Sequence, residues 1–267
     1  METLKQLHIN LSYPPPRLRP MSHLESNKFV AALAIIAVPF AIGAFFLAWS
    51  PADQFHNSDP QHDGYVQPRS VGDLVLTTQE STVSVFCTVS KNKGSMGTAW
   101  AIELDNGMEK NNATTLITNH HVIEECIGDK GKLTVAELWE KPVPAYIVKW
   151  DKKNDLAVLA TKLKLRPLGL SQSEPWPGYW VMVLGSADGY QGSVAFGSVL
   201  NATDYEIFIT ANMSHGNSGG PLIDNEGMVI GTASWGSKNE QYNGAKSLNA
   251  MCAKILKCKG KYYWARD

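Results

Sequence analysis

The sequence predicts a mainly β domain with Greek-key or barrel wiring, preceded by one membrane-spanning helix. Strand-like runs such as STVSVF, YWVMVLG and EIFITA recur between turn signals, and long amphipathic helical patterns are scarce. One uncharged apolar run near the amino terminus interrupts this pattern. The chain has 267 residues, enough for one sizeable domain with appendages. Its formal net charge of −1 calls for no nucleic-acid partner, and we expect none.

The apolar run, residues 29–49, is predicted to be a transmembrane helix. It reads FVAALAIIAVPFAIGAFFLAW, without a charge. As an α-helix it would reach about 31 Å, close to the hydrocarbon thickness of a bilayer. Pro39 and Gly43 lie inside it, and membrane helices tolerate these residues better than soluble helices do. A buried core helix is the alternative, but uncharged runs of this length are unusual in cores.

An uncleaved signal anchor explains this run better than a cleaved signal peptide, because the preceding segment and the apolar stretch are both long. Arg17, Arg19 and Lys28 precede the run, whereas only Arg69 lies reasonably near it on the far side. Basic residues favour the cytoplasmic side. We therefore expect a single-pass membrane protein with a cytoplasmic amino terminus. The large carboxy-terminal domain would lie on the outer side, in the periplasm or outside the cell.

The chain divides into four segments by composition. Residues 1–28 contain YPPPRLRP and predict a disordered cytoplasmic tail, with a ligand for a proline-recognising module as the alternative. After the span, residues 50–70 are polar and contain prolines, which is typical of an extended linker. The globular domain is predicted to occupy residues 71–267. The short stretch after residue 236 indicates a closing strand and a short helix rather than a further domain.

The cysteines bear on the compartment: Cys87, Cys126, Cys252 and Cys258. The outer side of a membrane is usually oxidising, which favours disulfides. Three pairings are possible, and the sequence does not select one. We expect Cys87 to pair with Cys126 and Cys252 with Cys258, and free buried thiols are the alternative. A zinc site is not expected, because ordinary ligand spacing is lacking in His120, His121 and Cys126.

Three stretches carry chemistry. MSHGNSGGPLID, residues 213–224, packs glycines around Ser218, which is either a nucleophile on a tight turn or part of a flexible polar loop. TNHHV follows an apolar strand and offers a histidine that is held on one side and open on the other, as a general base requires. In KKNDLAVLAT, Asp155 leads into a strand, where a partly buried carboxylate can accept the imidazole Nδ1–H. Each stretch alone is common, but together they follow the order His, Asp, Ser.

These residues resemble the chymotrypsin-fold serine proteases, and more closely the bacterial trypsin-like and high-temperature-requirement (Deg-type) branch. The matching pieces cover most of residues 80–236: GTAWAI, LITNHHVI, NDLAVL, PGYWVMVLGSADG, GSVAFGSVL, GNSGGPLIDNEGMVIG and SWG. The resemblance implies two six-stranded Greek-key β-barrels, residues 71–165 and 178–267, the second ending in a short helix. It makes His121, not His120, the base, Asp155 the orienting carboxylate and Ser218 the nucleophile. It implies no metal or organic cofactor.

The resemblance also assigns the residues that bind substrate. The oxyanion formed during acyl transfer would be held by backbone N–H groups of Gly216, Asn217 and Ser218. The substrate main chain would pair, as an added antiparallel strand, with the edge formed by Ser234, Trp235 and Gly236. Both assignments place the substrate across one cleft between the two barrels.

Two positions depart from the family pattern. Asn212 stands six residues before Ser218, where trypsin-like members carry the acid that selects Arg or Lys. A neutral side chain there predicts a small or medium uncharged residue before the scissile bond. Asn217 replaces the aspartate that pairs with a freshly cut amino terminus in zymogen-activated relatives, and no IVGG-like site precedes the domain. We therefore expect activity without that insertion switch.

The predicted function is a membrane-anchored serine endopeptidase that cleaves protein or peptide substrates without a trypsin-like Arg/Lys preference. A protease fold retained as a binding or sensing module, with vestigial catalysis, is the main alternative, and the complete triad argues against it. An esterase would use the same acyl-transfer chemistry but has no support of its own in the sequence. The physiological substrate and the oligomeric state stay open at this level.

Overall fold

The computed structural model describes residues 63–103, 114–128, 130–237, 240–256 and 258. By backbone contacts, every described residue belongs to one compact unit, residues 58–267. The predicted tail and span, and most of the predicted linker, lie outside the described residues. Among the helices of the described ranges, none has the length and apolarity needed to cross a membrane.

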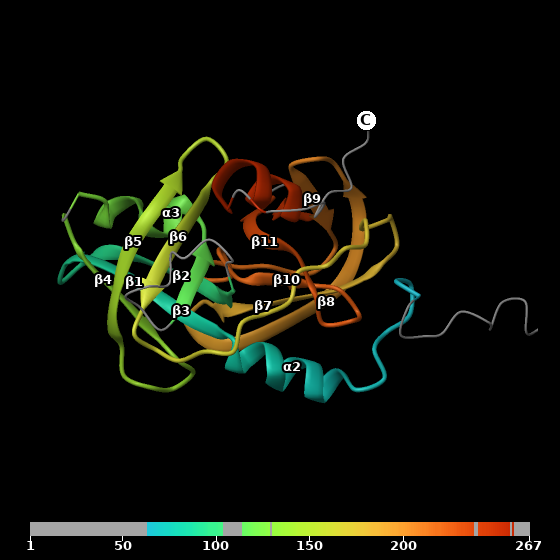
Figure 1. Cartoon of the computed structure of the whole chain (residues 1–267), viewed down its shortest axis with the longest axis horizontal. Helices are drawn as coiled ribbons and strands as arrows, with labels where there is room; N and C mark the ends of the chain where they lie inside the picture. The colour runs from blue at the N-terminus through green and yellow to red at the C-terminus, as the bar shows by residue number, and fades with distance from the viewer. Residues whose placement is uncertain (1–62, 104–113, 129, 238–239, 257, 259–267) are drawn as a thin grey trace, which may run out of the picture. The chain divides into compact units, whose positions relative to one another are not determined.

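Twelve strands form two closed antiparallel barrels of six strands each (Figure 1). The first barrel follows the order β1-β2-β3-β6-β5-β4. Its strands are β1 (Thr82–Ser90), β2 (Lys93–Ile102), β3 (Thr114–Thr118), β4 (Lys132–Ala136), β5 (Val143–Asp151) and β6 (Leu156–Thr161). The second follows β10-β11-β12-β9-β8-β7. Its strands are β7 (Trp180–Ala187), β8 (Tyr190–Ala202), β9 (Glu206–Ile209), β10 (Pro221–Ile223), β11 (Val229–Gly236) and β12 (Asn243–Ser247). The predicted pair of six-stranded barrels is confirmed.

The run LAVLAT shows why some strands read as continuous apolar segments. All six residues of β6 are buried. Ala157 and Leu159 face the core of the first barrel, whereas Leu156 and Val158 belong to a second core that also contains Met182 of the other barrel. A strand that is covered on both faces has no polar side, so the alternation expected of a half-buried strand disappears.

The C-terminal segment completes this core between the barrels. A short α-helix, α4 (Leu248–Ala250), continues into a single π-helical stretch, η2 (Met251–Leu256). The buried side chains that it supplies to the shared core include Met251, Ile255 and Leu256. This confirms the predicted short C-terminal helix and shows that it helps to join the two barrels rather than closing only one.

The first described segment differs from the expected extended linker. The buried Asn225 side chain donates to the carbonyls of Asp63 (2.6 Å) and Val66 (2.8 Å), and Trp180 N donates to Gly64 O (2.7 Å). Residues 63–66 are therefore attached to the second barrel. A ten-residue helix, α2 (Val71–Glu80), then precedes β1 and runs beneath the barrels in Figure 1. The sequence analysis did not predict α2, because the segment VGDLVLTTQE has low amphipathicity and matches neither a clear helical nor a clear strand pattern.

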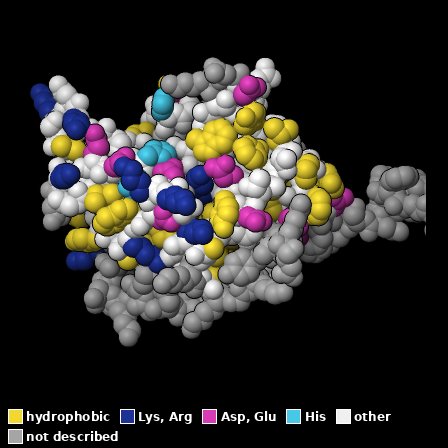
Figure 2. Space-filling model, turned by 90° about the horizontal axis from the view of Figure 1, so that it is seen from above, with side chains coloured by type: hydrophobic (Ala, Val, Ile, Leu, Met, Phe, Trp, Pro, Cys, Tyr) yellow, Lys and Arg dark blue, Asp and Glu magenta, His cyan; other side chains and the backbone are white. Residues whose placement is uncertain are grey.

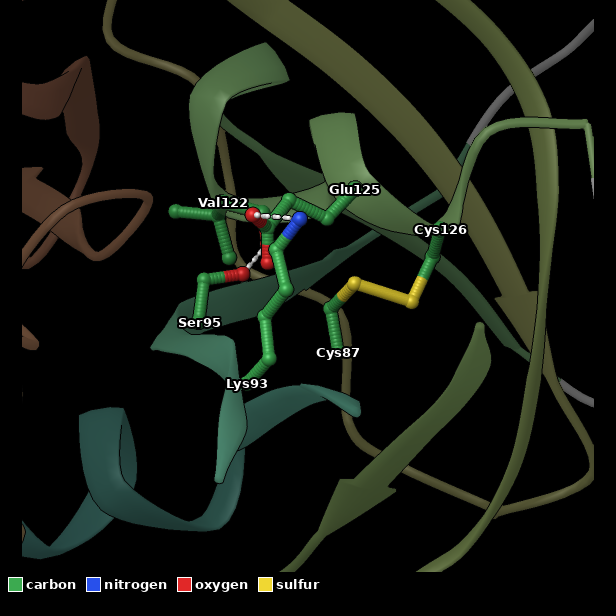
Figure 3. The surroundings of a disulfide bond; sticks show 6 residues. All are labelled: Cys87, Lys93, Ser95, Val122, Glu125 and Cys126. Atoms are coloured by element: carbon green, nitrogen blue, oxygen red, sulfur yellow. Dashed lines mark hydrogen bonds and ion pairs between the residues drawn. A yellow bond between two sulfur atoms is a disulfide. The ribbon is translucent and has the colours of Figure 1, made fainter. Parts of the chain in front are cut away.

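Two disulfides are formed, Cys87–Cys126 and Cys252–Cys258. The first joins β1 to η1 (Glu124–Cys126), the 3-10 turn that follows the short helix α3 (His120–Ile123). Figure 3 shows two further contacts beside it: the Ser95 hydroxyl donates to the Val122 carbonyl (2.6 Å), and Lys93 pairs with Glu125 (3.3 Å). The segment that carries His121 is thus fastened to β1 and β2 along its length.

Candidate active site

A cleft of about 700 Å³ contains side chains from both barrels. Its lining brings together residues that are far apart in the sequence: His121, Asp155, Asp188, Met213, Ser214, His215, Ser218, Ser234, Trp235, Gly236, Ser237 and Lys246. The predicted triad and the predicted substrate edge therefore share one concave site. Asn212 is exposed and does not line it.

Strand pairing explains why His121 and Asp155 meet. Strands β3 and β6 are antiparallel neighbours, with Thr118 opposite Ala157. The residues just after β3 therefore lie beside those just before β6. The imidazole Nδ1 lies 3.0 and 2.9 Å from the two carboxylate oxygens of Asp155, and the His121 backbone N–H donates to Oδ1 (3.0 Å). The ring is held in one orientation, and the side chain as a whole stays exposed to the cleft.

The Asp155 carboxylate is held from several sides. Its backbone is left-handed (φ 52°), a conformation that few non-glycine residues adopt. The buried Asn119 amide donates to its carbonyl oxygen (2.8 Å), and the Ser234 hydroxyl donates to Oδ2 (2.6 Å). Burial raises the pKa of Asp155, but the hydrogen bonds and charge of His121, with the Ser234 hydroxyl, outweigh it and bring that pKa below its ordinary value. The carboxylate is ionised at neutral pH.

Ser218 enters the same network through Ser234. The Ser218 hydroxyl donates to the Ser234 carbonyl oxygen (3.1 Å), while the Ser234 side chain holds Asp155. The hydrogen bonds of the described residues include none between Ser218 Oγ and the imidazole. In ligand-free sites such bonds are often long and shorten only when substrate binds. One residue of β11 thus links the serine of the second barrel to the His–Asp pair of the first.

Glycines shape the turn that carries Ser218. Gly216 (φ 98°) and Gly219 (φ 87°) both have left-handed backbones. A Cβ on Gly216 would lie 2.1 Å from the Ser186 carbonyl oxygen, and one on Gly219 would lie 2.1 Å from that of Thr98. Neither position has room for a side chain. The stretch is a fixed turn, not the flexible polar loop that was the alternative.

The carbonyl groups of the turn are pinned, which sets the direction of its N–H groups. His215 O accepts from Asp188 N (2.6 Å), and Asn217 O accepts from Gly220 N (3.0 Å). In a trans peptide the N–H points opposite to the C=O, so the Gly216 and Ser218 N–H groups point away from these partners. Within the described ranges neither donates to another protein group. The Asn217 N–H is committed to Ser214 O (3.2 Å), so Asn217 does not belong to the predicted oxyanion hole.

A model of the trypsin-like peptidase domain matches residues 97–231, which is half of the chain. The chain belongs to this family. It is 35% identical over 127 residues to a probable periplasmic serine endoprotease, DegP-like, of Chlamydia pneumoniae. It is 34% identical over 131 residues to the serine protease HTRA1 of Xenopus tropicalis. Each match covers 43% of this chain and 25% and 28% of the relative, so the chain spans about a quarter of their length.

Solved structures show the same fold. A protease of M. tuberculosis in its active form has a TM-score of 0.60 at 23% identity, covering 72% of this chain and 88% of that one. A serine endoprotease of Yersinia pestis has a TM-score of 0.59 at 22% identity, covering 71% and 66%. At these identities the likeness shows the trypsin-like peptidase fold alone.

In this trypsin-like peptidase a buried asparagine is paired across the sheet with Gly236, which lines the cleft. The side chain of Asn243 on β12 is buried and donates to the Ala211 carbonyl (2.7 Å). A Cβ on Gly236 would lie 2.9 Å from Asn243 Oδ1 and 4.0 Å from Met213 O. No sequence motif marked Asn243 or Asn119, because both act through contacts made only after folding.

No metal site is apparent in the part of the chain that the structure describes, where no three His, Cys, Asp or Glu side chains are grouped to hold an ion. His120 is buried beside His121 in α3, whereas His121 faces the cleft. The two adjacent histidines are therefore distinguished by burial.

Proposed function

We propose that the chain is a serine endopeptidase in which Ser218 is the nucleophile, His121 the general base and Asp155 the orienting carboxylate. The observation that carries the proposal is the linked set of hydrogen bonds from His121 through Asp155 and Ser234 to Ser218 in one cleft. The ionised carboxylate accepts the Nδ1–H, which leaves Nε2 as the proton acceptor on the cleft side. The family relationship supports peptide-bond hydrolysis.

The reaction follows from these positions. His121 takes the Ser218 proton while the hydroxyl oxygen attacks the peptide carbonyl, and the resulting oxyanion accepts hydrogen bonds from the Gly216 and Ser218 N–H groups. The imidazolium then donates its proton to the leaving amine, which releases the carboxy-terminal fragment with a new free amino group and leaves the amino-terminal fragment as an acyl-enzyme. Water, deprotonated by His121, attacks the ester and releases the acid and Ser218.

A small, uncharged side chain is the proposed choice before the scissile bond. The predicted preference rested on Asn212, whose side chain carries no charge. The buried Asn243 amide, paired across the sheet with Gly236 of the cleft lining, is neutral as well. Neither side chain would attract an Arg or Lys of the substrate.

The catalytic unit is proposed to act on the outer side of a membrane, anchored by residues 29–49. Support comes from the uncharged run and the excess of basic residues before it. Two disulfides favour an oxidising compartment, and the Chlamydia relative is named periplasmic. Protease added outside intact spheroplasts should digest the folded unit slowly but cut the linker. Recovery of the full chain in the soluble fraction would contradict the anchor.

The nucleophile is tested with the purified full chain, a casein-type substrate and a fluorophosphonate probe. Wild type should react covalently and cleave, and Ser218→Ala should do neither. Ser84→Ala, which removes another buried serine hydroxyl close to the barrel junction, is a matched control that should still label. Equal labelling of wild type and Ser218→Ala would overturn the assignment.

A binding or sensing module is the second candidate. It is favoured by one observation, the Ser218 hydroxyl bonded to a backbone carbonyl rather than to the imidazole. In such a module wild type would bind peptides in the cleft but would neither label nor cleave, so the same experiment separates the two functions.

A further inference from the structure

Two aromatic side chains are the most exposed of the large hydrophobic residues that the structure describes. Trp139 is 80% exposed and Tyr190 is 77% exposed. Trp139 lies in the loop between β4 and β5 of the first barrel, and Tyr190 begins β8 of the second. The two loops are joined directly, because Trp139 N donates to the side-chain oxygen of Gln191 (2.8 Å). The face drawn in Figure 2, on which neither residue is labelled, also has hydrophobic side chains between charged ones.

The loop around Trp139 is held rigidly in this position. Trp139 has φ 61°, a left-handed backbone that is rare for a bulky residue. The preceding Leu138 packs onto the second barrel, where a Cβ on Gly192 would lie 2.9 Å from its methyl group. The Gly192 carbonyl in turn accepts from Gln79 of α2 (2.9 Å). Leu138 is therefore anchored on the second barrel while Trp139 is turned toward solvent. Strained backbone of this kind is concentrated at functional sites.

The turn beside Tyr190 forms part of the cleft wall. Asp188 lines the cleft, has a left-handed backbone (φ 47°) and donates its N–H to the His215 carbonyl. It therefore contacts the nucleophile turn from the connection between β7 and β8, whereas Ser234 lies on β11. A substrate whose residues before the scissile bond lie along Ser234–Gly236 would leave the cleft, after that bond, past residues 188–190.

We propose that Trp139 and Tyr190 form a docking surface, here called the aromatic exosite, for apolar side chains in the polypeptide that follows the scissile bond. This inference rests on the proposed function. Rigid aromatic side chains lose little conformational entropy on contact and bury a large apolar area, which is why they dominate recognition surfaces. The exosite is continuous with the cleft through Asp188, so its occupant is the substrate itself.

The test uses the full chain and three substrates that share the residues before the bond, ending in alanine. One carries an apolar, aromatic-containing segment of about six residues after the bond, roughly 20 Å when extended. The second carries glycine and serine there, and the third carries only a chromogenic leaving group. Trp139→Ala with Tyr190→Ala should lower kcat/KM on the first by about 5- to 10-fold, through KM, and leave the other two unchanged. Trp150→Ala, another exposed tryptophan, is the matched control and should change none.

A binding measurement makes the exosite testable without turnover. In the Ser218→Ala background the double variant should bind the apolar peptide about 5- to 10-fold more weakly and the glycine–serine peptide equally well. This result would support the exosite even if wild type failed to cleave the chromogenic substrate, a failure that would overturn only the proposed function. Equal losses on all three substrates, no loss on any, or a loss confined to vesicle binding or to self-association would each overturn the exosite.

Discussion

The two barrels contribute to the cleft in different ways. The first barrel supplies His121 and Asp155, which are held by side-chain hydrogen bonds from Asn119 and Ser234 and by the contacts around the Cys87–Cys126 disulfide. The second supplies Ser218 on a turn that is held by its backbone, through two left-handed glycines and pinned carbonyl groups. Positioning depends on side-chain chemistry in one half and on the absence of side chains in the other.

This difference indicates where each half is vulnerable. Substitutions that alter a hydrogen-bonding group should damage the first half and leave the turn intact. Substitutions that add even one carbon atom should damage the second half and leave the His–Asp pair intact. A substitution in one half of the site can therefore be studied while the other half keeps its structure.

The largest effect is expected from Asp155→Asn. An asparagine amide directed at Nδ1 favours the wrong imidazole tautomer, and such a change lowers kcat by about 10⁴-fold in the Ser-His-Asp template. Steady-state kinetics on a casein-type or chromogenic substrate measure it. KM should change little, because the substrate edge and the oxyanion turn are untouched. A loss below about tenfold would mean that the carboxylate does not orient the base.

Gly216→Ala should lower kcat by about 10²- to 10³-fold, the loss typical of one missing oxyanion donor. Its Cβ would lie 2.1 Å from a backbone oxygen, so the turn must shift. Gly128→Ala is the matched control: it also has a left-handed backbone (φ 74°), but its Cβ would have nothing within 4 Å. If both variants lost activity equally, backbone strain rather than the position of the N–H group would explain the effect.

Asn119→Ala should lower kcat by about 10- to 100-fold, because a small displacement of Asp155 misplaces the base. KM should stay unchanged, and the pH profile of kcat should shift as the carboxylate loses its fixed place. Asn249→Ala removes another buried amide, away from the cleft, and should leave both kcat and the profile as they are. An unshifted profile in Asn119→Ala would assign the residue to stability alone.

The smallest effect concerns the pH dependence of stability. The pKa of Asp155 lies below its ordinary value of 3.8 in the folded protein. The ionised group therefore stabilises the fold above that value, and this stabilisation is lost as the pH falls through the folded-state pKa. The Tm advantage of wild type over Asp155→Asn should shrink below about pH 4 and be constant near neutrality. An advantage that grew on acidification would contradict the lowered pKa.

Much of the fold and the candidate site was accessible from local patterns. The glycines of GNSGGPL indicate a tight turn. The motifs TNHHV and NDLAVL lie at the ends of β3 and β6, and the pairing of these strands brings the two motifs together. Other features were not accessible. The helix α2 has no strong period, and the packing of residues 63–66 depends on Asn225, which is about 160 residues away in the chain.

The sequence by itself predicted a mainly β domain and, through the resemblance to chymotrypsin-fold proteases, the two barrels and the candidate triad, because strand patterns, turn glycines and the order of the motifs are local properties of the chain. Only the tertiary structure decided which groups complete the site. Ser234 joins the two halves, Asn119 holds Asp155, and Asn243 holds the Ala211 carbonyl beside the cleft wall. Each of these roles is a hydrogen bond between segments distant in sequence, and such contacts exist only once the barrels have closed.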